Sequence, residues 1–98
     1  MGTFEWDPRK EVQNIIKHGI DFTTASTIWD GVVYERPDDR RDYGEDRFQA
    51  FGIVGNRILT VVFTWRGSTR RLISARRASR GEKGSFEAEI RRAESVKN

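Results

Sequence analysis

Alternation of apolar and polar residues between residues 47 and 76 constrains the fold of this chain more than any other feature. Ile58–Trp65 is a β-branched run, typical of a strand that is buried on both faces. The segments Gly55-Asn56 and Arg66-Gly67-Ser68 flank this run and carry turn signals. Thr69–Arg76 follows as a further strand, and the segment before the Gly55-Asn56 turn, in which Phe48, Ala50 and Val54 alternate with the residues between them, is the first strand. The pattern predicts a three-stranded antiparallel meander.

Helical signals precede the meander. Pro8–His18 is predicted to be a helix, with Asp7 as its N-cap and Gly19 as its stop. Within it, Val12, Ile15 and Ile16 have the spacing of one apolar stripe. A second short helix is predicted over Phe22–Trp29, so the two form a helical hairpin.

A terminal helix is predicted after the meander. Ser79 and Glu82 have the spacing of a capping box. The face of this helix is marked by Phe86, Ile90 and Ala93, and Glu87 and Arg91 have the spacing of a favourable ion pair.

The predicted elements give one α+β domain over residues 1–98, with helices packed on an antiparallel sheet. Val32–Tyr34 is a candidate fourth strand, so the sheet is expected to have three to four strands. The segment Arg36–Asp46 is charged and has no apolar period, and we expect a mobile loop there.

Positive charge is concentrated in the second half of the chain. The overall charge is +3, but residues 1–49 hold seven cations against eleven anions, and residues 50–98 hold eleven against four. No acidic residue lies between Asp46 and Glu82, and the eight cations of that interval are all arginines. Because the guanidinium fork matches phosphate, a partner made of phosphates is the leading expectation.

Composition excludes several classes of site and location. The chain has no cysteine and one histidine, so thiolate nucleophiles, Cys-ligated zinc and His-rich metal sites are excluded, and no metal or other cofactor is expected. Apolar runs are only a few residues long, and the first residues lack a basic region followed by an apolar stretch. We therefore expect a cytoplasmic protein without a membrane partner.

A phosphate partner and the lack of a metal site together favour one reaction. RNA can be cleaved by its own 2′-hydroxyl, which attacks the adjacent phosphorus. The protein then needs only to orient the backbone, neutralise charge and move protons. Arginine-rich strands around one histidine or lysine suffice for this chemistry.

The sequence resembles the BrnT-type toxins of bacterial type II toxin–antitoxin systems, relatives of the RelE/ParE superfamily. The resemblance extends from Phe4 to about Glu87, and the order of its pieces makes it specific. The matching pieces are Phe4-x-Trp6-Asp7-Pro8-x-Lys10, Asn14-x-x-Lys17-His18-Gly19-Ile20-x-Phe22, Gly44-Glu45-x-Arg47-Phe48, Gly52, Leu59-x-Val61-Val62-x-Thr64-x-Arg66-Gly67, Arg71-x-Ile73-Ser74-Ala75-Arg76-x-Ala78 and Glu82.

This resemblance implies a RelE-like fold, metal-independent RNA cleavage and toxicity that a BrnA-type antitoxin neutralises. It also implies that operator DNA is bound only indirectly, through the antitoxin. The oligomeric state stays open between a toxin homodimer and a 2:2 complex with the antitoxin. The sequence departs from the family at Phe86, where a tyrosine is common, and at Trp65, where an acidic residue is common.

Five residues are candidates for catalysis. We expect Arg66 and Arg76 to hold the scissile phosphate and His18 to transfer a proton, with Lys17 and Glu45 as helpers. Each has a simpler interpretation: His18 could cap the end of its helix, where the imidazolium is favoured, and Glu45 could form a local ion pair with Arg47.

Further residues are candidates for contacts with the RNA backbone and bases. Arg76 and Arg77 point to opposite faces of the strand, and we choose Arg76 for the site. The predicted RNA-binding residues are Arg47, Trp65, Arg70, Arg71 and Arg77.

Two alternatives remain open at this point. The chain could be a nucleic-acid-binding module without catalysis, whose affinity would fall steeply with salt. It could also be an interaction protein whose basic strip binds an acidic partner.

Overall fold

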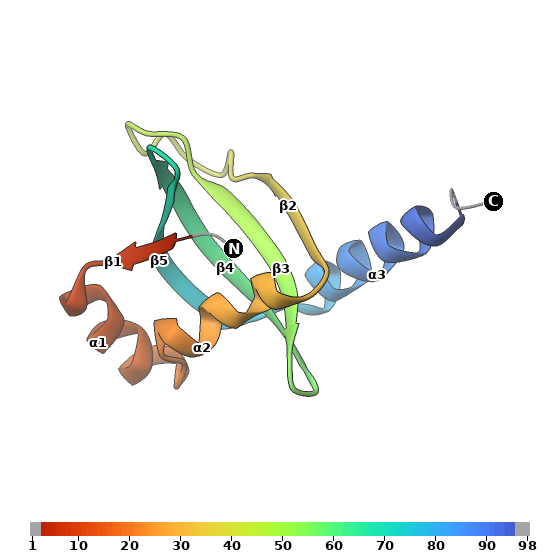
Figure 1. The fold of residues 1–98 in the computed structure, drawn as a ribbon, viewed down its shortest axis with the longest axis horizontal. Coiled ribbons are helices and arrows are strands. Elements are labelled where there is room, and N and C mark those ends of the chain that lie inside the picture. Colours follow the sequence, from red (N-terminus) through yellow and green to blue (C-terminus); the bar gives the residue numbers. More distant parts are fainter. Residues whose placement is uncertain (1–2, 96–98) are drawn as a thin grey trace.

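The computed structural model describes residues 3–95, in which five strands form one sheet and helices lie on both of its sides (Figure 1). The elements in chain order are β1 (Thr3–Trp6), α1 (Pro8–His18), α2 (Phe22–Ser26), the 3₁₀ helix η1 (Thr27–Asp30), β2 (Val33–Pro37), β3 (Phe48–Val54), β4 (Arg57–Arg66), β5 (Thr69–Arg77) and α3 (Arg80–Ser95). The predicted α+β class is confirmed. None of the helices in this described part is long and apolar enough to cross a membrane.

The predicted meander forms the centre of the sheet, whose strand order is β1-β5-β4-β3-β2. Val54 pairs with Arg57 across a two-residue turn, and Arg66 pairs with Thr69 across another. Gly55 and Gly67 take positive φ values of 62° and 61° at these turns, a conformation that favours glycine. The candidate fourth strand is β2, antiparallel to β3.

The prediction of a three- to four-stranded antiparallel sheet is wrong at its edge. Residues Thr3–Trp6 form a fifth strand, β1, which runs parallel to β5, so the sheet is mixed. Thr3 pairs with Thr69, and Trp6 pairs with Leu72. A segment of four residues is too short to reveal its pairing, because its partner lies 66 residues further along the chain.

Helix α1 has its predicted bounds and caps. The Asp7 side chain accepts a hydrogen bond from the Arg9 N–H at 2.9 Å, and Gly19 ends the helix at φ 72°. The apolar stripe of α1, however, is not buried against the sheet. The exposed fractions are 56% for Val12, 45% for Ile15 and 80% for Ile16.

The buried residue of α1 is Asn14, which is 5% exposed. Its amide nitrogen donates to the carbonyl oxygens of Ile20 (2.9 Å) and Ala75 (2.8 Å), and its oxygen accepts from the Ala75 N–H at 3.0 Å. Pairing between β1 and β5 ends at Leu72, so Asn14 satisfies the edge of β5 just beyond it. Because these hydrogen bonds require Asn14 to face β5, the polar side of α1 faces the sheet and its apolar stripe faces solvent.

The main core lies between the sheet and α2–η1. The predicted helix over Phe22–Trp29 is in fact a short α-helix continued by η1, and Asp21 caps it by accepting from the Thr24 N–H at 3.0 Å. Ile28 packs so closely on β3 that a Cβ at Gly52 would lie 2.6 Å from the Ile28 Cβ. The buried core residues are Ile20, Phe22, Ala25, Ile28, Ala50, Leu59, Val61, Phe63, Leu72 and Ala75.

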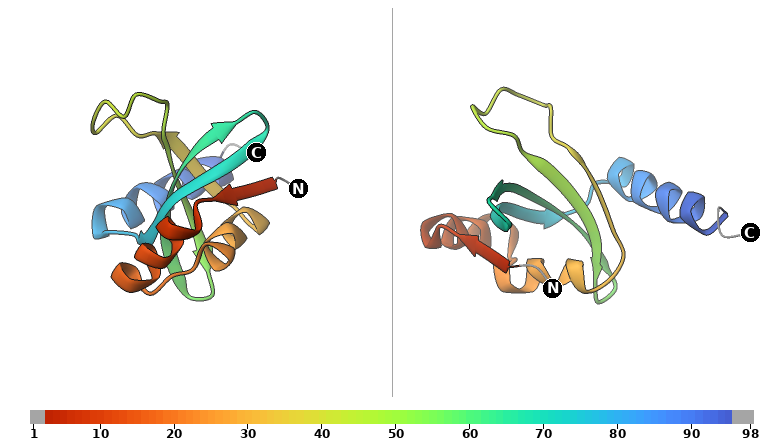
Figure 2. Two further views of the ribbon diagram at one scale, coloured as in Figure 1. Left: turned by 90° about the vertical axis from the view of Figure 1, so that its left-hand side faces the viewer. Right: turned by 45° about the horizontal axis from the view of Figure 1, so that its top comes forward.

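Helix α3 begins at the predicted capping box on the other side of the sheet. The Ser79 N–H donates to Glu82 Oε1 at 2.8 Å, and the Glu82 N–H donates to Ser79 Oγ at 3.2 Å. Only Phe86 of α3 is buried, at 1% exposed, and the C-terminal part of the helix projects away from the sheet (Figure 2). The predicted apolar face is therefore wrong at Ala93, which is exposed.

The predicted ion pair on α3 is also replaced. Glu87 and Arg91 form no ion pair among the interactions of residues 3–95, whereas Arg92 and Glu89 do, at 3.0 Å. Since both partners of either pair lie on the projecting part of α3, the exchange has little effect on the packing of the domain.

Candidate nucleic-acid interface

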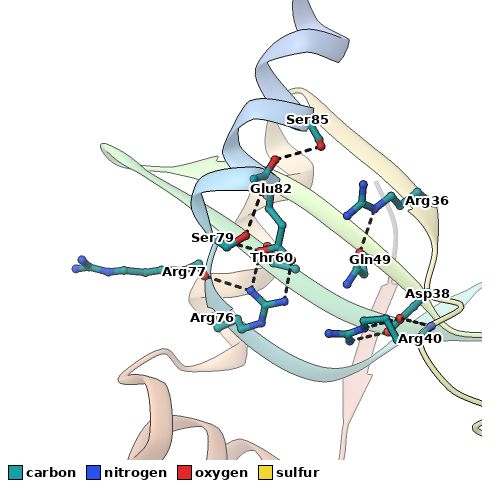
Figure 3. A network of polar contacts seen from close by, with 11 residues as sticks. Arg36, Asp38, Arg40, Gln49, Thr60, Arg76, Arg77, Ser79, Glu82 and Ser85 are labelled. Carbon is teal, nitrogen blue, oxygen red and sulfur yellow. Dashed lines mark hydrogen bonds and ion pairs between the residues drawn. The ribbon is translucent and has the colours of Figure 1, made fainter.

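The sheet surface on which α3 packs, called the α3 face below, collects polar and basic side chains. Along β4, Leu59, Val61 and Phe63 point into the core, so the alternate residues Thr60 and Val62 point to the α3 face. The same alternation along β5 places Arg76 on this face and the adjacent core residue Ala75 on the other. Figure 3 shows side chains from β2, β4, β5 and α3 on this side.

The loop between β2 and β3 borders a hollow of about 390 Å³ at this face. Its lining residues are Arg40, Arg41, Tyr43, Arg47, Val62, Ile73 and Ser74. Val62 pairs with Ser74 and Phe63 with Leu72, so Ile73 is an extra residue in β5. This bulge directs two consecutive residues of β5 toward the hollow.

Asp38 ties this loop to the sheet. Its side chain is fully buried and accepts from Arg40 Nε at 2.7 Å, Arg40 Nη2 at 2.8 Å and the Tyr43 hydroxyl at 3.3 Å. Its backbone N–H donates to the Arg47 carbonyl at 2.8 Å. The Arg40 hydrogen bonds hold the pKa of Asp38 below its ordinary value, so the pair stays charged. The segment expected to be a mobile loop therefore has a buried anchor.

Arg76 is held by a carboxylate at the start of α3 (Figure 3). Its Nη1 donates to Glu82 Oε1 at 2.7 Å, and its Nη2 donates to Glu82 Oε2 at 2.9 Å. Glu82 Oε1 also accepts from Thr60 Oγ1 at 3.0 Å. The Arg76 hydrogen bonds, more than the backbone donor of Ser79, lower the pKa of Glu82 to about 2. The guanidinium is thereby fixed, while its Nε–H and one Nη2–H still face no protein acceptor among residues 3–95.

A second group brings together three of the predicted residues. Glu45 Oε2 accepts from Arg47 Nε at 3.0 Å, and Glu45 Oε1 lies 4.0 Å from Arg66 Nη2. Arg47 also stacks over the Tyr43 ring, 4.1 Å from its centroid. Two cations thus share one carboxylate, and the Arg66 side chain is 57% exposed. The simpler interpretation of Glu45, an ion pair with Arg47, is observed.

Arg66 and Arg76 are not brought together. Arg76 pairs with Thr60, six residues before Arg66 along β4, which corresponds to about 20 Å at the rise of a strand. The two arginines therefore lie toward opposite ends of the α3 face. They can contact one RNA strand, but each at a different phosphate.

His18 and Lys17 end α1, which packs against β5. Partial burial first, then the positive charges of Lys17 and Arg76, lower the pKa of His18 below its ordinary value of 6.5. The C-terminal end of α1 favours the charged imidazolium, but burial and the two positive charges have a larger effect on the pKa of His18. His18 is therefore neutral at pH 7 and within electrostatic reach of Arg76.

The remaining predicted arginines have different surroundings. Arg70 lies on the core side, with its guanidinium 4.7 Å from the Trp29 ring centroid and 4.5 Å from that of Trp65, and it pairs with Glu35 at 3.0 Å. Arg71 pairs with Glu5 of β1 at 2.6 Å. The Arg77 side chain extends away from Arg76 (Figure 3).

Sequence reasoning missed the contribution of the loop. Arg40, Arg41 and Tyr43 line the hollow, although the loop carrying them has no regular pattern. The sequence feature that could have indicated this role is an aromatic residue, Tyr43, within a run of charged residues shortly before Arg47 and strand β3. The spacing of Glu82 indicates a cap, but it does not indicate that Glu82 is also the partner of Arg76.

Acidic residues and His18 do not gather into a cluster of three or more that could hold a metal ion anywhere in residues 3–95. The α3 face instead carries arginines, of which Arg76 pairs with Glu82 while Arg47 and Arg66 share Glu45.

Comparison with known proteins gives a matching family and similar solved structures. A family described as "Ribonuclease toxin, BrnT, of type II toxin-antitoxin system" matches residues 6–82. The 1.1 Å crystal structure of the Brucella abortus ribonuclease toxin BrnT is similar, with a TM-score of 0.61 and 31% sequence identity, over 82% of this chain and 100% of that chain. Among curated proteins, none matches the chain.

Proposed function

The chain belongs to the BrnT family of ribonuclease toxins of type II toxin–antitoxin systems, and from this premise we propose that it cleaves RNA without a metal ion. The nucleophile is the 2′-hydroxyl of the RNA. A bond forms between the 2′-oxygen and phosphorus, and the bond from phosphorus to the 5′-oxygen breaks. One proton leaves the 2′-hydroxyl and one reaches the departing 5′-oxygen, so the products end in a 2′,3′-cyclic phosphate and a 5′-hydroxyl.

The end of the α3 face near Arg76 is the proposed reaction centre, and the fixed geometry of Arg76 is the observation that carries this choice. Two hydrogen bonds to Glu82 hold its guanidinium, and donors remain for a phosphate. Preorganised donors of this kind stabilise the charge that develops on the phosphorane oxygens. Glu82 acts here as a positioning residue.

His18 is the proposed proton acceptor. Its lowered pKa keeps the imidazole neutral at pH 7, as a base requires. Lys17 supports this state through its charge. A phosphate bound at Arg76 would offset the positive charge that helps to lower the pKa of His18, and would so favour protonation of the imidazole as the 2′-hydroxyl loses its proton.

The other end of the α3 face is proposed to bind a neighbouring part of the same strand. Arg47 and Arg66 both pair with Glu45, and Asp46 lines the adjacent hollow, so the 57% exposure of the Arg66 side chain, and not an excess of positive charge, supports this contact. Trp65 borders a hollow of about 350 Å³ at the same end of β4, but its ring lies on the core side, where Arg70 stacks 4.5 Å from its centroid. Glu45 positions the two arginines, and the part of the Trp65 ring that stays exposed (41%) is proposed to stack on a base at the edge of the sheet.

For Arg70, Arg71 and Arg77, an RNA contact stays a prediction. Arg70 pairs with Glu35 and is covered by the Trp29 and Trp65 rings on the core side, and Arg71 pairs with Glu5 at the β1 edge, so both lie away from the Arg76 end of the α3 face. Arg77 has no such partner in residues 3–95 and keeps its full charge for a ligand.

The proposed partner is a BrnA-type antitoxin that neutralises the toxin and carries the contact with operator DNA, in a 2:2 complex or on a toxin homodimer. Exposed Val12, Ile15 and Ile16 on α1 support a protein partner, because apolar patches of this kind mark interaction sites. Lys10 and Lys17 are exposed on the same helix, so the fitting segment is an amphipathic helix with an acidic flank. We also propose that the protein acts in the cytoplasm, where its RNA substrate is. Its single domain is proposed to be related to the RelE toxins.

Inducible expression in bacteria tests the function. Growth arrest with fragmented RNA is expected for the wild type, and Arg76→Gln should restore growth. Arg66→Gln should retain cleavage with a raised KM, and Lys10→Gln is the matched control for loss of one exposed cation. Growth and intact RNA during wild-type expression would favour the non-catalytic nucleic-acid-binding module.

A further inference from the structure

A second basic hollow lies at the end of the sheet opposite to Arg66. It measures about 360 Å³ and is lined by Asn56, Arg57, Ile58, Arg77 and Lys83. These residues come from three elements: the β3–β4 hairpin with the start of β4, the end of β5, and the first turn of α3. The hollow thus lies where three parts of the chain meet.

The three cations of this hollow lack a counter-charge among the residues that the structure describes. Arg57, Arg77 and Lys83 make no ion pair with any carboxylate of residues 3–95, and no acidic residue lines the hollow. Glu82 precedes Lys83 directly, but its oxygens are occupied by Arg76, Thr60 and Ser79. Like charges gathered without compensation repel, and an anionic ligand relieves that repulsion.

Strand register brings the two arginines to the same side. Arg77 pairs with Leu59, and Arg57 precedes Leu59 by two residues, so Arg57 and Arg77 are diagonal neighbours on one face, about 7–8 Å apart. The Ala78 N–H donates to the Ile58 carbonyl at 2.9 Å and continues this pairing beyond the end of β5. Lys83 adds a third cation in the first turn of a helix of 16 residues, where the helix dipole is also positive.

We propose that this hollow is a phosphate-binding subsite for the RNA strand, beyond the phosphate bound at Arg76. The proposal rests on the proposed function. Arg76 and Arg77 are consecutive but point to opposite faces of β5, so a strand that leaves Arg76 around the end of β5 meets Arg77 next. The two guanidinium forks and the ammonium group bind the phosphate oxygens, and the Asn56 amide adds a donor.

The test compares two triple variants in RNA binding. One carries Arg57→Gln, Arg77→Gln and Lys83→Gln. The control carries Lys10→Gln, Arg91→Gln and Arg92→Gln, which remove the same charge from exposed positions of α1 and α3. The probe is a single-stranded RNA with 2′-O-methyl groups, which cannot be cleaved by its own hydroxyl. Thermal unfolding confirms that each variant is folded.

We expect the subsite variant to bind this RNA at least about tenfold more weakly than the control. The slope of log K against log salt should fall by about 0.7 for each phosphate that the variant no longer neutralises. Equal affinity and equal slope in the two variants would overturn the subsite while leaving cleavage at Arg76 intact. Wild-type binding without any cleavage of unmodified RNA would instead overturn the proposed function and leave the subsite standing.

Inorganic phosphate distinguishes a strand phosphate from a free anion. Saturable shifts of the Asn56, Arg77 and Lys83 amide resonances with phosphate, together with weaker RNA binding in the subsite variant, support the proposal. The same shifts with unchanged RNA binding would assign the hollow to a free anion and overturn its role in RNA binding.

Discussion

Arg76 and Glu82 form two parallel hydrogen bonds, at 2.7 and 2.9 Å, that join the end of β5 to the first turn of α3. Glu82 also completes the capping box with Ser79, so one carboxylate begins the helix and fixes the arginine. This double use explains how a helix with one buried residue stays attached to the sheet. It also means that stability and activity are linked at this position.

Replacing Glu82 by glutamine should lower the free energy of unfolding by about 2 kcal/mol at pH 7. The folded pKa of Glu82, about 2, lies below the ordinary value of 4.5 that it has in the unfolded chain. Its stabilising contribution is therefore present above pH 4.5 and is lost as the pH falls toward 2. Urea unfolding at pH 7 and pH 3 should show a smaller difference between wild type and variant at pH 3.

The same substitution should lower kcat by about tenfold with little change in KM, because Arg76 loses its position and not its charge. Single-turnover cleavage measures this. An unchanged kcat in a folded Glu82→Gln variant would remove Glu82 from the reaction.

His18→Gln should abolish the acidic limb of the pH profile. The pKa of His18 is lowered below 6.5, and protonation removes the base. The wild-type kcat/KM should therefore fall only at pH values below 6.5. The His18→Gln variant should have a low kcat/KM that does not change with pH below 6.5. Lys10→Gln serves as the control. An acidic limb that persists in the His18 variant would assign the titration to another group.

Helix α1 offers a paired test of its orientation. Asn14→Ala should lower the free energy of unfolding by about 2–4 kcal/mol, because it leaves buried backbone groups of Ala75 and Ile20 without partners. Ile16→Ala should change it by less than about 0.5 kcal/mol, since Ile16 is 80% exposed. Urea denaturation of both variants shows which substitution lowers the free energy of unfolding more. A larger effect for Ile16→Ala would contradict the described packing.

Gly52→Ala should destabilise the domain by about 2 kcal/mol, because the new Cβ would lie 2.6 Å from the Cβ of Ile28. Gly31→Ala is the control, since nothing lies within 4 Å of a Cβ there and φ is −127°. Thermal unfolding of the two variants measures the contrast. Equal melting temperatures would show that η1 does not press on β3.

Local signals account for the parts of the fold that the sequence predicts correctly. The bounds of α1 follow from Asp7, Pro8 and Gly19, and both hairpins follow from glycines that adopt positive φ. These features act within a few residues of one another. Their outcome therefore depends little on the rest of the molecule.

Long-range pairing accounts for the errors. The strand β1 and the inward position of Asn14 both depend on the edge of β5, more than 60 residues away. The apolar stripe of α1 suggests a buried face, but this helix covers a strand edge that needs an amide. Spacing within α1 contains no information about that edge.

The sequence predicts which types of residue form the candidate site, but not how these residues are arranged in space. Sequence reasoning selects Arg66 and Arg76 together, but only the register of β4 with β5 shows that they lie at opposite ends of one face. It also leaves out the loop residues Arg41 and Tyr43. Their place at the hollow depends on Asp38, whose burial no local pattern indicates.

The proposed mechanism requires that the RNA supply its own nucleophile to a site built from arginines and one histidine. A decisive experiment uses a labelled RNA and a matched copy with a single 2′-deoxynucleotide at the mapped cleavage site, both incubated with the purified protein in EDTA. We expect cleavage of the RNA to a 2′,3′-cyclic phosphate and no cleavage at the deoxy position. Cleavage of the deoxy copy at the same site, or a strict requirement for a divalent cation, would refute the mechanism.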